Sequence, residues 1–532
     1  MHRNTTLIAV VLSAFFPHGS ANAQEPYSHL VPRGQIRLEV SGEYLSFSSR
    51  YRMWSDGTAT REGLEGLSDP FTGPAGVMVF PFLSPTEQAV RDAMGDDYAL
   101  SLGTMASFME KNRARVPISL DVGIFDWLTA GVVVPAVQNE TEFAFHFEAD
   151  SLEANTGFGP AMSNPGVVTD FLSGLQGSIS EYDAYREAAC TSDPNSPDCM
   201  NATQVLAGAV GFQGALSAMY GTRFAPLGWS PTGMALQERL SVLAMAFAAA
   251  GVTGVPAAVP LADALLTPED FLTLVADPAF GIEATNPLGQ WRALWSVGDI
   301  ELRADARLFE FGEPGSSRHL AAGAGALLRL PTGDQDHPAN FIDAATGDAQ
   351  TDLELRGWLN GRWRGGFGLW ADLRYGIQLK GTTERRVFDP DVTFAPLSSQ
   401  IKLDWDPGDY HFVELAPWYR VAESMTLLAG YRYHRKGRDT FSVAAGDGTE
   451  PPAGDARPDP ELLVPHSEAS SSRFMVGMVY NRATPTLDGN RGSPLEVRLV
   501  YRQVVGGSGG NVPKAGSIEA GLRVFARLWG ER

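Results

Sequence analysis

The stretch from Val297 to Lys380 constrains the fold of this chain more than any other. It holds four segments in which apolar and polar side chains alternate, and tight turns join the first segment to the second and the third to the fourth. Because successive side chains of a β-strand point to opposite faces, each segment has one apolar and one charged face. The segments are about 13 residues long, and a tilted strand crosses a bilayer with roughly 9–11. This pattern predicts transmembrane strands of an outer-membrane barrel.

Alternating segments continue on both sides of this stretch. Together they predict an all-β fold, an antiparallel transmembrane β-barrel of about 12 strands with a large, mainly helical insertion. An even strand number is typical of bacterial single-chain barrels. The predicted strands are 35–50, 113–124, 128–138, 297–311, 318–331, 352–364, 367–380, 409–421, 425–438, 470–483, 494–506 and 516–529.

The connections between these segments alternate in length. With the mature N-terminus in the periplasm, the long connections fall on the outside and the short ones on the periplasmic side, as in outer-membrane barrels. A soluble sandwich has no reason to sort its connections in this way. The long connections are 51–112, 139–296, 332–351, 381–408 and 439–469, with a shorter one at 507–515, and the short ones include 125–127, 312–317, 364–366 and 422–424.

The segment 139–296 breaks the strand pattern. Helical periodicity predicts helices at 167–189, 203–220, 234–250 and 268–275. We expect an inserted helical subdomain, placed either as an extracellular cap or as a plug in the lumen. The two cysteines of the chain, Cys190 and Cys199, lie in this insertion, and a pair in an exported chain predicts a disulfide.

The N-terminus predicts export. A short basic start is followed by an apolar run from Leu7 to Phe16 and by a small-x-small site that ends at Ala23, the features of a signal peptide. No later stretch approaches about 18 continuous apolar residues. We therefore expect a Gram-negative-type outer membrane location. The predicted organisation is a signal peptide at 1–23, first barrel strands with a long external loop at 24–138, the helical insertion at 139–296 and the remaining strands at 297–532.

If the apolar face of the barrel contacts lipid, the polar face lines the lumen. Acidic and basic residues interleave on it, so they can pair across strands and brace the wall, or the arginines can set the field of a water-filled pore. The lumen-lining candidates are Arg303, Asp305, Arg307, Glu354, Arg356, Arg362, Asp372, Arg374, Arg432, Arg498, Glu519 and Arg523, and Glu301, Glu414, Arg420, Glu496, Arg502 and Arg527 share this face.

Three tryptophans, Trp358, Trp370 and Trp418, also fall on the polar face. They could stack on an aromatic or hydrophobic solute, or they could fill a gap in the wall. The other aromatic residues lie mostly near strand ends or on the outward face, where interfacial girdles need them.

We find no catalytic or cofactor-binding pattern. The chain lacks the motifs of serine hydrolases, zinc proteases and phosphate-binding loops, so we expect neither an enzyme nor a cofactor or metal site. The carboxylates of 330–336 lack the spacing of a calcium loop and predict a turn that ends a strand. The net charge of −21 argues against a nucleic-acid partner.

Three short motifs carry a family resemblance. The sequences FDWLTAG at 125–131, GDIEL at 298–302 and LPTGD at 330–334 resemble the outer-membrane family named for the MetA pathway of phenol degradation. The resemblance covers 113–138 and 297–529. It implies a barrel that moves small, often aromatic compounds across the outer membrane, and the insertion is much larger than the family pattern.

We therefore expect a channel for passive uptake or efflux of small, aromatic or hydrophobic molecules. Its expected partners are outer-membrane lipid, a small-molecule solute and the barrel assembly machinery, for which Trp529 is the candidate recognition residue. The alternative is a barrel that only anchors a surface-exposed insertion, which would bind a partner.

Overall fold

The computed structural model describes residues 29–55, 60–95, 98–150, 153–277, 290–312, 316, 318–338, 340, 342–389, 391–422, 424–444, 459–482 and 495–529. The predicted signal peptide lies outside the described residues.

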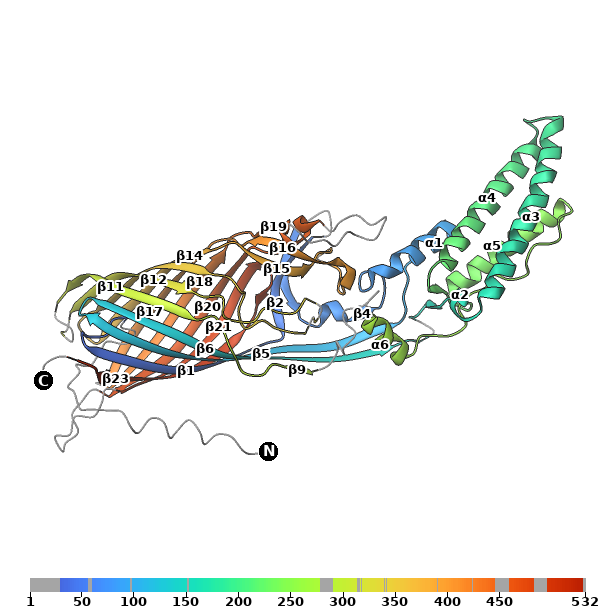
Figure 1. Ribbon diagram of the computed structural model, residues 1–532. Helices are drawn as coiled ribbons and strands as arrows, with labels where there is room; N and C mark the ends of the chain where they lie inside the picture. The colour runs from blue at the N-terminus through green and yellow to red at the C-terminus, as the bar shows by residue number, and fades with distance from the viewer. Residues whose placement is uncertain are drawn as a thin grey trace.

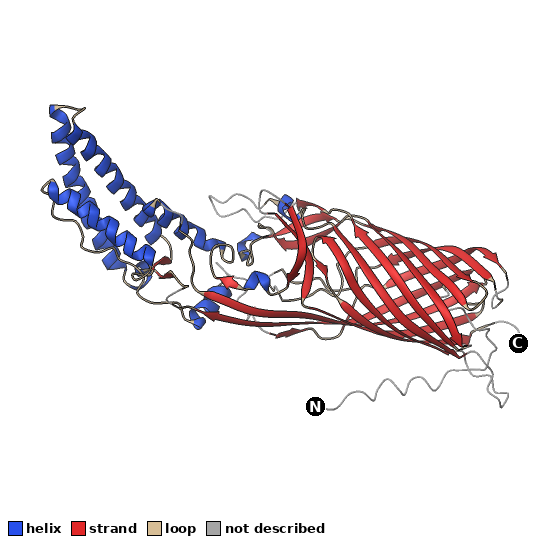
Figure 2. Cartoon of the chain, turned by 180° about the vertical axis from the view of Figure 1, so that it is seen from behind, coloured by secondary structure: helices blue, strands red, loops and turns tan. Residues whose placement is uncertain are grey.

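Within these residues, twelve antiparallel strands close into a barrel (Figures 1 and 2). Each strand pairs with its neighbours in the chain, and β1 closes the ring because it pairs with both β5 and β23. This confirms the predicted fold class and strand number. The strands are β1 (Gln35–Phe47), β5 (Thr104–Phe125), β6 (Leu128–Glu148), β11 (Glu301–Phe311), β12 (His319–Arg329), β13 (Asp352–Arg362), β14 (Phe367–Gln378), β17 (Tyr410–Ala422), β18 (Met425–Lys436), β20 (Ala469–Arg482), β21 (Leu495–Gly509) and β23 (Gly516–Arg527).

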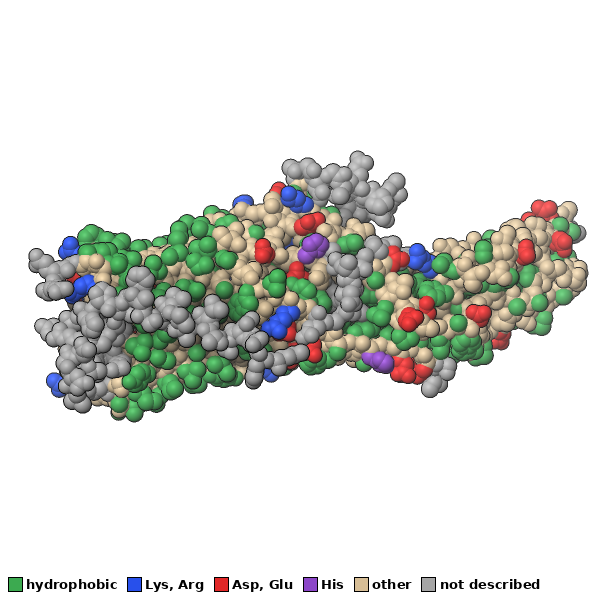
Figure 3. Space-filling model, turned by 60° about the horizontal axis from the view of Figure 1, so that its bottom comes forward, with side chains coloured by type: hydrophobic (Ala, Val, Ile, Leu, Met, Phe, Trp, Pro, Cys, Tyr) green, Lys and Arg blue, Asp and Glu red, His purple; other side chains and the backbone are tan. Residues whose placement is uncertain are grey.

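The two faces of the wall differ as the alternation predicts. On β13 and β14, Leu355 and Leu373 point outward and are 50% and 56% exposed, whereas Glu354 and Asp372 point inward and are 2% and 1% exposed. Hydrophobic side chains cover much of the barrel wall on the face seen in Figure 3. An apolar outer face with a charged interior is the arrangement of a transmembrane barrel in the outer membrane.

The connections segregate by length, as predicted. The short turns after β5, β11, β13 and β17 lie at one end of the barrel, where Gln35 of β1 also pairs with Arg527 of β23. The long connections predicted from the sequence follow β1, β6, β12, β14 and β18, so they lie at the other end. This second end is the external end, and the end with the short turns is the periplasmic end, in the orientation that outer-membrane barrels adopt.

Small sheets and short helices cover the external end. One sheet contains β2 (Ser49–Ser55), β3 (Thr60–Gly66) and β22 (Val512–Pro513), and another contains β15 (Gly381–Arg386), β16 (Gln400–Asp406) and β19 (Thr440–Val443). The short strands β4 (Gly73–Pro74), β9 (Gln290–Arg292) and β10 (Ser296–Val297) pair with β5 or β6, and 3-10 turns lie at Asp69–Phe71, Pro81–Leu83, Leu397–Ser399 and Pro460–Leu463.

A helical arm extends beyond the external end (Figures 1 and 2). Strands β5 and β6 have 22 and 21 residues, so their hairpin continues past the barrel and carries the arm. The described helices of the insertion therefore lie outside the lumen. The arm contains α2 (Pro160–Ser163), α3 (Pro165–Ser192), α4 (Pro197–Tyr220), α5 (Pro231–Ala249), α6 (Pro268–Ala276), β7 (Thr156–Phe158) and β8 (Phe224–Pro226), and α1 (Ser84–Met94) packs against α4.

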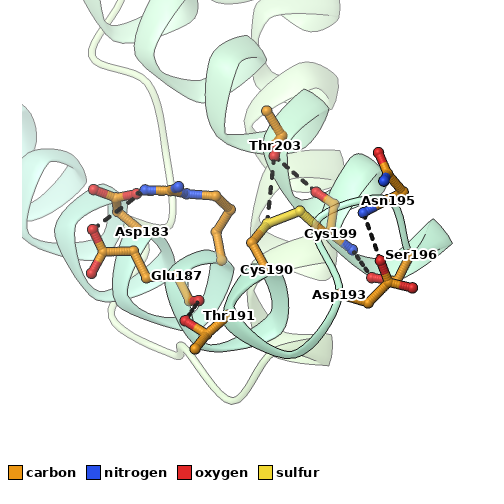
Figure 4. The surroundings of a disulfide bond; sticks show 10 residues. Asp183, Glu187, Cys190, Thr191, Asp193, Asn195, Ser196, Cys199 and Thr203 are labelled. Carbon is orange, nitrogen blue, oxygen red and sulfur yellow. Dashed lines mark hydrogen bonds and ion pairs between the residues drawn. A yellow bond between two sulfur atoms is a disulfide. The ribbon is translucent and has the colours of Figure 1, made fainter.

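The predicted disulfide is confirmed. Cys190 near the end of α3 and Cys199 in the first turn of α4 are bonded, with their Cα atoms 4.7 Å apart (Figure 4). Around it, the Ser196 hydroxyl caps α4 by accepting a hydrogen bond from the Cys199 backbone N–H at 3.2 Å. The bond thus fixes the turn between the two longest helices.

The largest hydrophobic core lies in the arm and at its junction with the hairpin, not in the barrel. At this junction Phe271 of α6 stacks on Phe147 of β6 with ring centroids 4.2 Å apart. The location follows from the surroundings, because apolar residues of the barrel wall can face lipid while those of the arm must face each other. Among the described residues, no helix is long and apolar enough to cross a membrane.

Candidate transport pathway in the lumen

Ion pairs between neighbouring strands fill the middle of the lumen. The Asp121 carboxylate on β5 accepts hydrogen bonds from Arg303 on β11 at 2.9 and 2.8 Å and from Arg37 on β1 at 3.0 Å. The Asp121 side chain is only 1% exposed. Two guanidinium groups therefore satisfy a carboxylate that would be costly to bury alone.

The same arrangement repeats across β13, β14 and β17. Asp372 accepts two hydrogen bonds from Arg356, both 2.9 Å, and one from Arg374, also 2.9 Å. The other side of the Arg374 guanidinium donates to Glu354 at 3.0 Å, and the Tyr410 hydroxyl donates to the same carboxylate at 3.0 Å. Of the predicted residues in this group, Asp305 lies farther away, with its carboxylate 3.7 Å from Arg356.

A third group joins β21 and β23 to β1. Arg523 donates to Glu39 at 2.7 Å and to Glu496 at 2.8 Å, while Arg498 lies 2.7 Å from Glu39. Arg498 and Arg502 both donate to Glu519. On the adjacent wall Arg432 donates to Glu414. These pairs leave little uncompensated charge in the middle of the lumen, which favours the bracing interpretation of the network.

The last two predicted residues, Arg307 and Arg362, lie towards the periplasmic end. A β-bulge between Arg307 and Phe309 shifts the alternation of β11, so that Glu310 pairs with Arg307 at 2.8 Å and with His319 at 3.1 Å. Arg362 donates to the Ser316 carbonyl. Strict alternation from Arg307 places Glu310 on the outer face, so sequence reasoning missed its pairing.

Residues 29–34, which precede β1, lie against the inner wall near the periplasmic end; we name them the plug segment. Trp370 Nε1 donates to His29 Nε2 at 3.3 Å, and the Trp358 ring lies 5.4 Å from the His29 ring. Leu30 packs in a buried cluster with Trp358 and Ala321, and the Val31 N–H donates to Thr129 Oγ1 at 2.7 Å. Two of the three inward tryptophans therefore hold the plug segment. No periodicity in the sequence indicates this segment.

Three cavities lie along the path from the external loops to the plug segment, in an order given by the positions on β1 and β5. The external cavity, about 520 Å³, lies among the loops and is lined by Arg50, Arg52, Lys111, Trp405, Phe441 and His466. The upper lumen cavity, about 520 Å³, is lined by Glu43, Arg113, Arg115, Arg329, Asp348 and Arg473. The lower lumen cavity, about 280 Å³, is lined by His29, Arg37, Glu39, Arg115, Arg303 and Trp370.

Sequence reasoning did not single out the inward residues of the first two barrel strands. Arg37, Glu39 and Asp121 complete the ion pairs, and Arg113 and Arg115 line the cavities. The signal was present, because the odd-numbered residues of 35–43 are polar and the even-numbered ones largely apolar.

Two of the short motifs, at 298–302 and 330–334, meet at the external end of β11 and β12. Gly333 N donates to Asp299 Oδ1 at 2.9 Å. The Thr332 hydroxyl donates to the Gly298 carbonyl at 2.8 Å and accepts from the Ile300 N–H at 2.9 Å. The motifs thus form a clasp that ends the strands. Within the described part of the chain, no group of three or more His, Cys, Asp or Glu side chains could hold a metal ion.

No family model matches the chain, and no curated protein matches its sequence. Solved structures that resemble it include an outer membrane channel from Pseudomonas putida F1, with 9% identity, coverage of 94% of this chain and 99% of that one, and a TM-score of 0.40. The toluene transporter TbuX of Ralstonia pickettii gives 8% identity, coverage of 94% and 90%, and a TM-score of 0.27. The toluene transporter TodX of Pseudomonas putida gives 11% identity, coverage of 94% of this chain and 90% of that one, and a TM-score of 0.26.

Proposed function

We propose that the protein is a passive outer-membrane channel for small molecules with aromatic or otherwise apolar bodies. One observation carries the proposal: a closed barrel with an apolar outer wall encloses two cavities lined by charged residues, and a third cavity among the external loops leads to them. The twelve predicted lumen residues act mainly as the braced wall of this path. No step of the function requires a catalytic group or a cofactor.

The apolar preference rests on the walls of the external cavity. Phe71, Phe388, Trp405 and Phe441 line this cavity together with Leu462. Aromatic side chains supply large apolar contact area to a solute that leaves water. A small aromatic compound can therefore gather here before it meets the charged lumen.

Passage into the periplasm requires the plug segment to move, since it lines the innermost cavity. The segment contacts Trp370, Trp358 and Thr129, and Gly34 at its end is fixed by backbone hydrogen bonds with Gly123, Leu528 and Trp529. Residues 29–33 can be displaced while Gly34 keeps these backbone hydrogen bonds. We propose that the conformation with this segment against the wall is the closed state of the channel, and that residues 29–33 leave the wall in the open state.

We further propose that the chain is exported by a signal peptide cleaved near Ala23, is inserted by the barrel assembly machinery, and belongs to the MetA-pathway type of barrel. The hydrogen bond between Gly333 and Asp299 supports the assignment to this type of barrel, because it joins two of the three motifs that carry the resemblance.

Reconstitution tests the function. Purified protein in planar bilayers and in liposomes should conduct ions and admit small aromatic solutes, and it should migrate differently on detergent gels before and after heating. Protein that remains soluble without detergent, or liposomes that stay impermeable with a variant lacking residues 29–34, would contradict the proposal.

The second candidate is a barrel that anchors a binding arm, and the arm surface favours it. Met200 on α4 and Met234 and Met245 on α5 are 58%, 56% and 63% exposed. Flexible apolar methionines are frequent on binding surfaces. Replacing 149–289 by a short linker separates the candidates. Unchanged solute flux together with lost partner binding assigns the arm to an interaction, whereas altered flux assigns it to the channel.

A further inference from the structure

One strand supplies a cation to every cavity of the path. Lys111, Arg113 and Arg115 are alternate residues of β5, so their side chains share the inner face. Lys111 lines the external cavity, Arg113 and Arg115 line the upper lumen cavity, and Arg115 also lines the lower one. We name these three residues the basic ladder.

The upper part of the ladder differs from the rest of the lumen in its pairing. Arg115 lies 3.5 Å from Glu301. Among the described residues, however, no carboxylate oxygen lies within 4.0 Å of the charged group of Lys111 or Arg113. The same holds for Arg473, which lines the upper cavity from β20. Most arginines of the lumen form an ion pair with a carboxylate of the protein. Lys111, Arg113 and Arg473 do not, so they can bind the carboxylate of a solute.

The carboxylates that line the upper lumen cavity form no ion pair with Arg113 or Arg473 among the described residues. Asp299 accepts a hydrogen bond from the Gly333 N–H and Asp348 accepts one from the Gln350 N–H. Glu43 has no ion pair among the described residues, so it too leaves both guanidinium groups without one. The guanidinium groups of Arg113 and Arg473 can therefore donate charge-assisted hydrogen bonds to an anion that enters the cavity.

The neutral part of such an anion also finds a suitable wall. Leu45, Pro135 and Val137 line the upper lumen cavity beside the two arginines. The cavity of about 520 Å³ falls within the roughly 300–1,000 Å³ of small-molecule sites. Cationic side chains with apolar neighbours suit a solute that carries one carboxylate on an apolar body.

We propose that the upper lumen cavity is a binding site for small organic monocarboxylates, with Arg113 and Arg473 as the carboxylate ligands and Lys111 as the cation that guides the anion from the external cavity. This inference rests on the proposed channel function and specifies its solute class. Rings of arginine and lysine serve anion-conducting pores in the same way.

Binding to the full-length protein in detergent tests the site without requiring flux. The probes are benzoate and benzyl alcohol, which share a ring and differ in charge, and affinity is measured by titration calorimetry. The double variant Arg113→Gln/Arg473→Gln should bind benzoate about tenfold more weakly or worse, as expected for lost charge-assisted hydrogen bonds. Its affinity for benzyl alcohol should not change.

Arg435→Gln provides the matched control, because Arg435 is exposed on the outward face of β18 and lines none of the three cavities. This variant should bind benzoate as the wild type does. Equal benzoate affinity in the double variant and the wild type, or equal affinity of the wild type for both probes, would overturn the proposal.

Flux into liposomes separates this failure from failure of the channel function. If the protein binds benzoate through the two arginines but liposomes admit no solute, the binding site is supported and the channel function is contradicted. A protein that admits benzyl alcohol but shows no preference for benzoate retains the channel and loses the site.

Discussion

Trp370 Nε1 on β14 donates a hydrogen bond of 3.3 Å to Nε2 of His29, which lies 341 positions earlier in the chain. This contact ties the plug segment to the barrel wall. It connects the aromatic residues of the lumen to the closed state of the path, and it makes that state testable by a single substitution.

Trp370→Phe should favour the open state. The substitution keeps an aromatic ring but removes the donor, and a neutral hydrogen bond contributes about 0.5–1.5 kcal/mol, so release of the plug segment should rise by up to about tenfold. Single-channel recordings should show more frequent openings. Trp418→Phe is the control, because Trp418 Nε1 is buried without a hydrogen-bond partner among the described residues. Equal effects of both substitutions would show that the hydrogen bond does not hold the plug segment.

Asp121→Asn should destabilise the barrel. The variant leaves Arg37 and Arg303 without their shared carboxylate, and breaking a buried ion pair from one side costs about 3–5 kcal/mol. The heat-modifiable gel shift should therefore occur at a lower temperature. Glu43→Gln removes an inward carboxylate that has no ion pair among the described residues, so it should leave the transition in place. A normal transition for Asp121→Asn would contradict the bracing role.

Loss of the disulfide should loosen the arm and spare the barrel. Cys190 and Cys199 are 9 positions apart, and closing a loop of this size stabilises a fold by about 2–3 kcal/mol in the chain-entropy account. In Cys190→Ser/Cys199→Ser, the helical signal should melt earlier and proteases should cut sooner between α3 and α4. The gel shift of the barrel should not move. A matching loss of barrel stability would show that the two parts unfold as one.

Acidification should loosen the external loop that carries His466. Burial and the nearby Arg52 lower the pKa of His466 below its ordinary value of about 6.5. The packed loop therefore binds a proton less readily than the released loop, so its stability is present above about pH 6.5 and is lost as pH falls below it. The hydrogen-exchange protection factors of residues 459–468, which are corrected for the slower intrinsic exchange at low pH, should fall on acidification. His466→Asn should abolish this pH dependence, and a persistent dependence in that variant would assign it to another group.

Much of the barrel could be predicted from the sequence, because the alternation of apolar and polar side chains within each strand already assigns them to the outer and inner faces. Alternation assigned Leu355 and Glu354 to opposite faces, and all twelve strands appear near their predicted bounds. The exceptions are β6, which ends at Glu148 and not at Gln138, and β5, which begins at Thr104 and not at Arg113, because 104–112 pair with 140–148 outside the membrane part of the barrel. That pairing also explains why the described helices of the arm lie beyond the barrel and not in the lumen.

The remaining features depend on contacts that no local pattern encodes. Glu310 reaches the lumen only because of the bulge after Arg307. The plug segment is short, has no periodicity and gains its place from residues such as Thr129 and Trp370. Which cations lack a partner, above all Arg113 and Arg473, depends on which side chains β5 and the distant strand β20 bring to one cavity.

In the proposed channel, solutes cross the lumen past the plug segment. Leu30 and Ala321 belong to one buried cluster, so oxidation of the pair Leu30→Cys/Ala321→Cys, with bond formation verified by mass spectrometry, would fix the plug segment to β12. The background carries Cys190→Ser/Cys199→Ser, so that reduction acts on the new bond alone. Benzoate flux into liposomes should stop when the pair is oxidised and return when it is reduced. Equal flux in the two states would contradict the account.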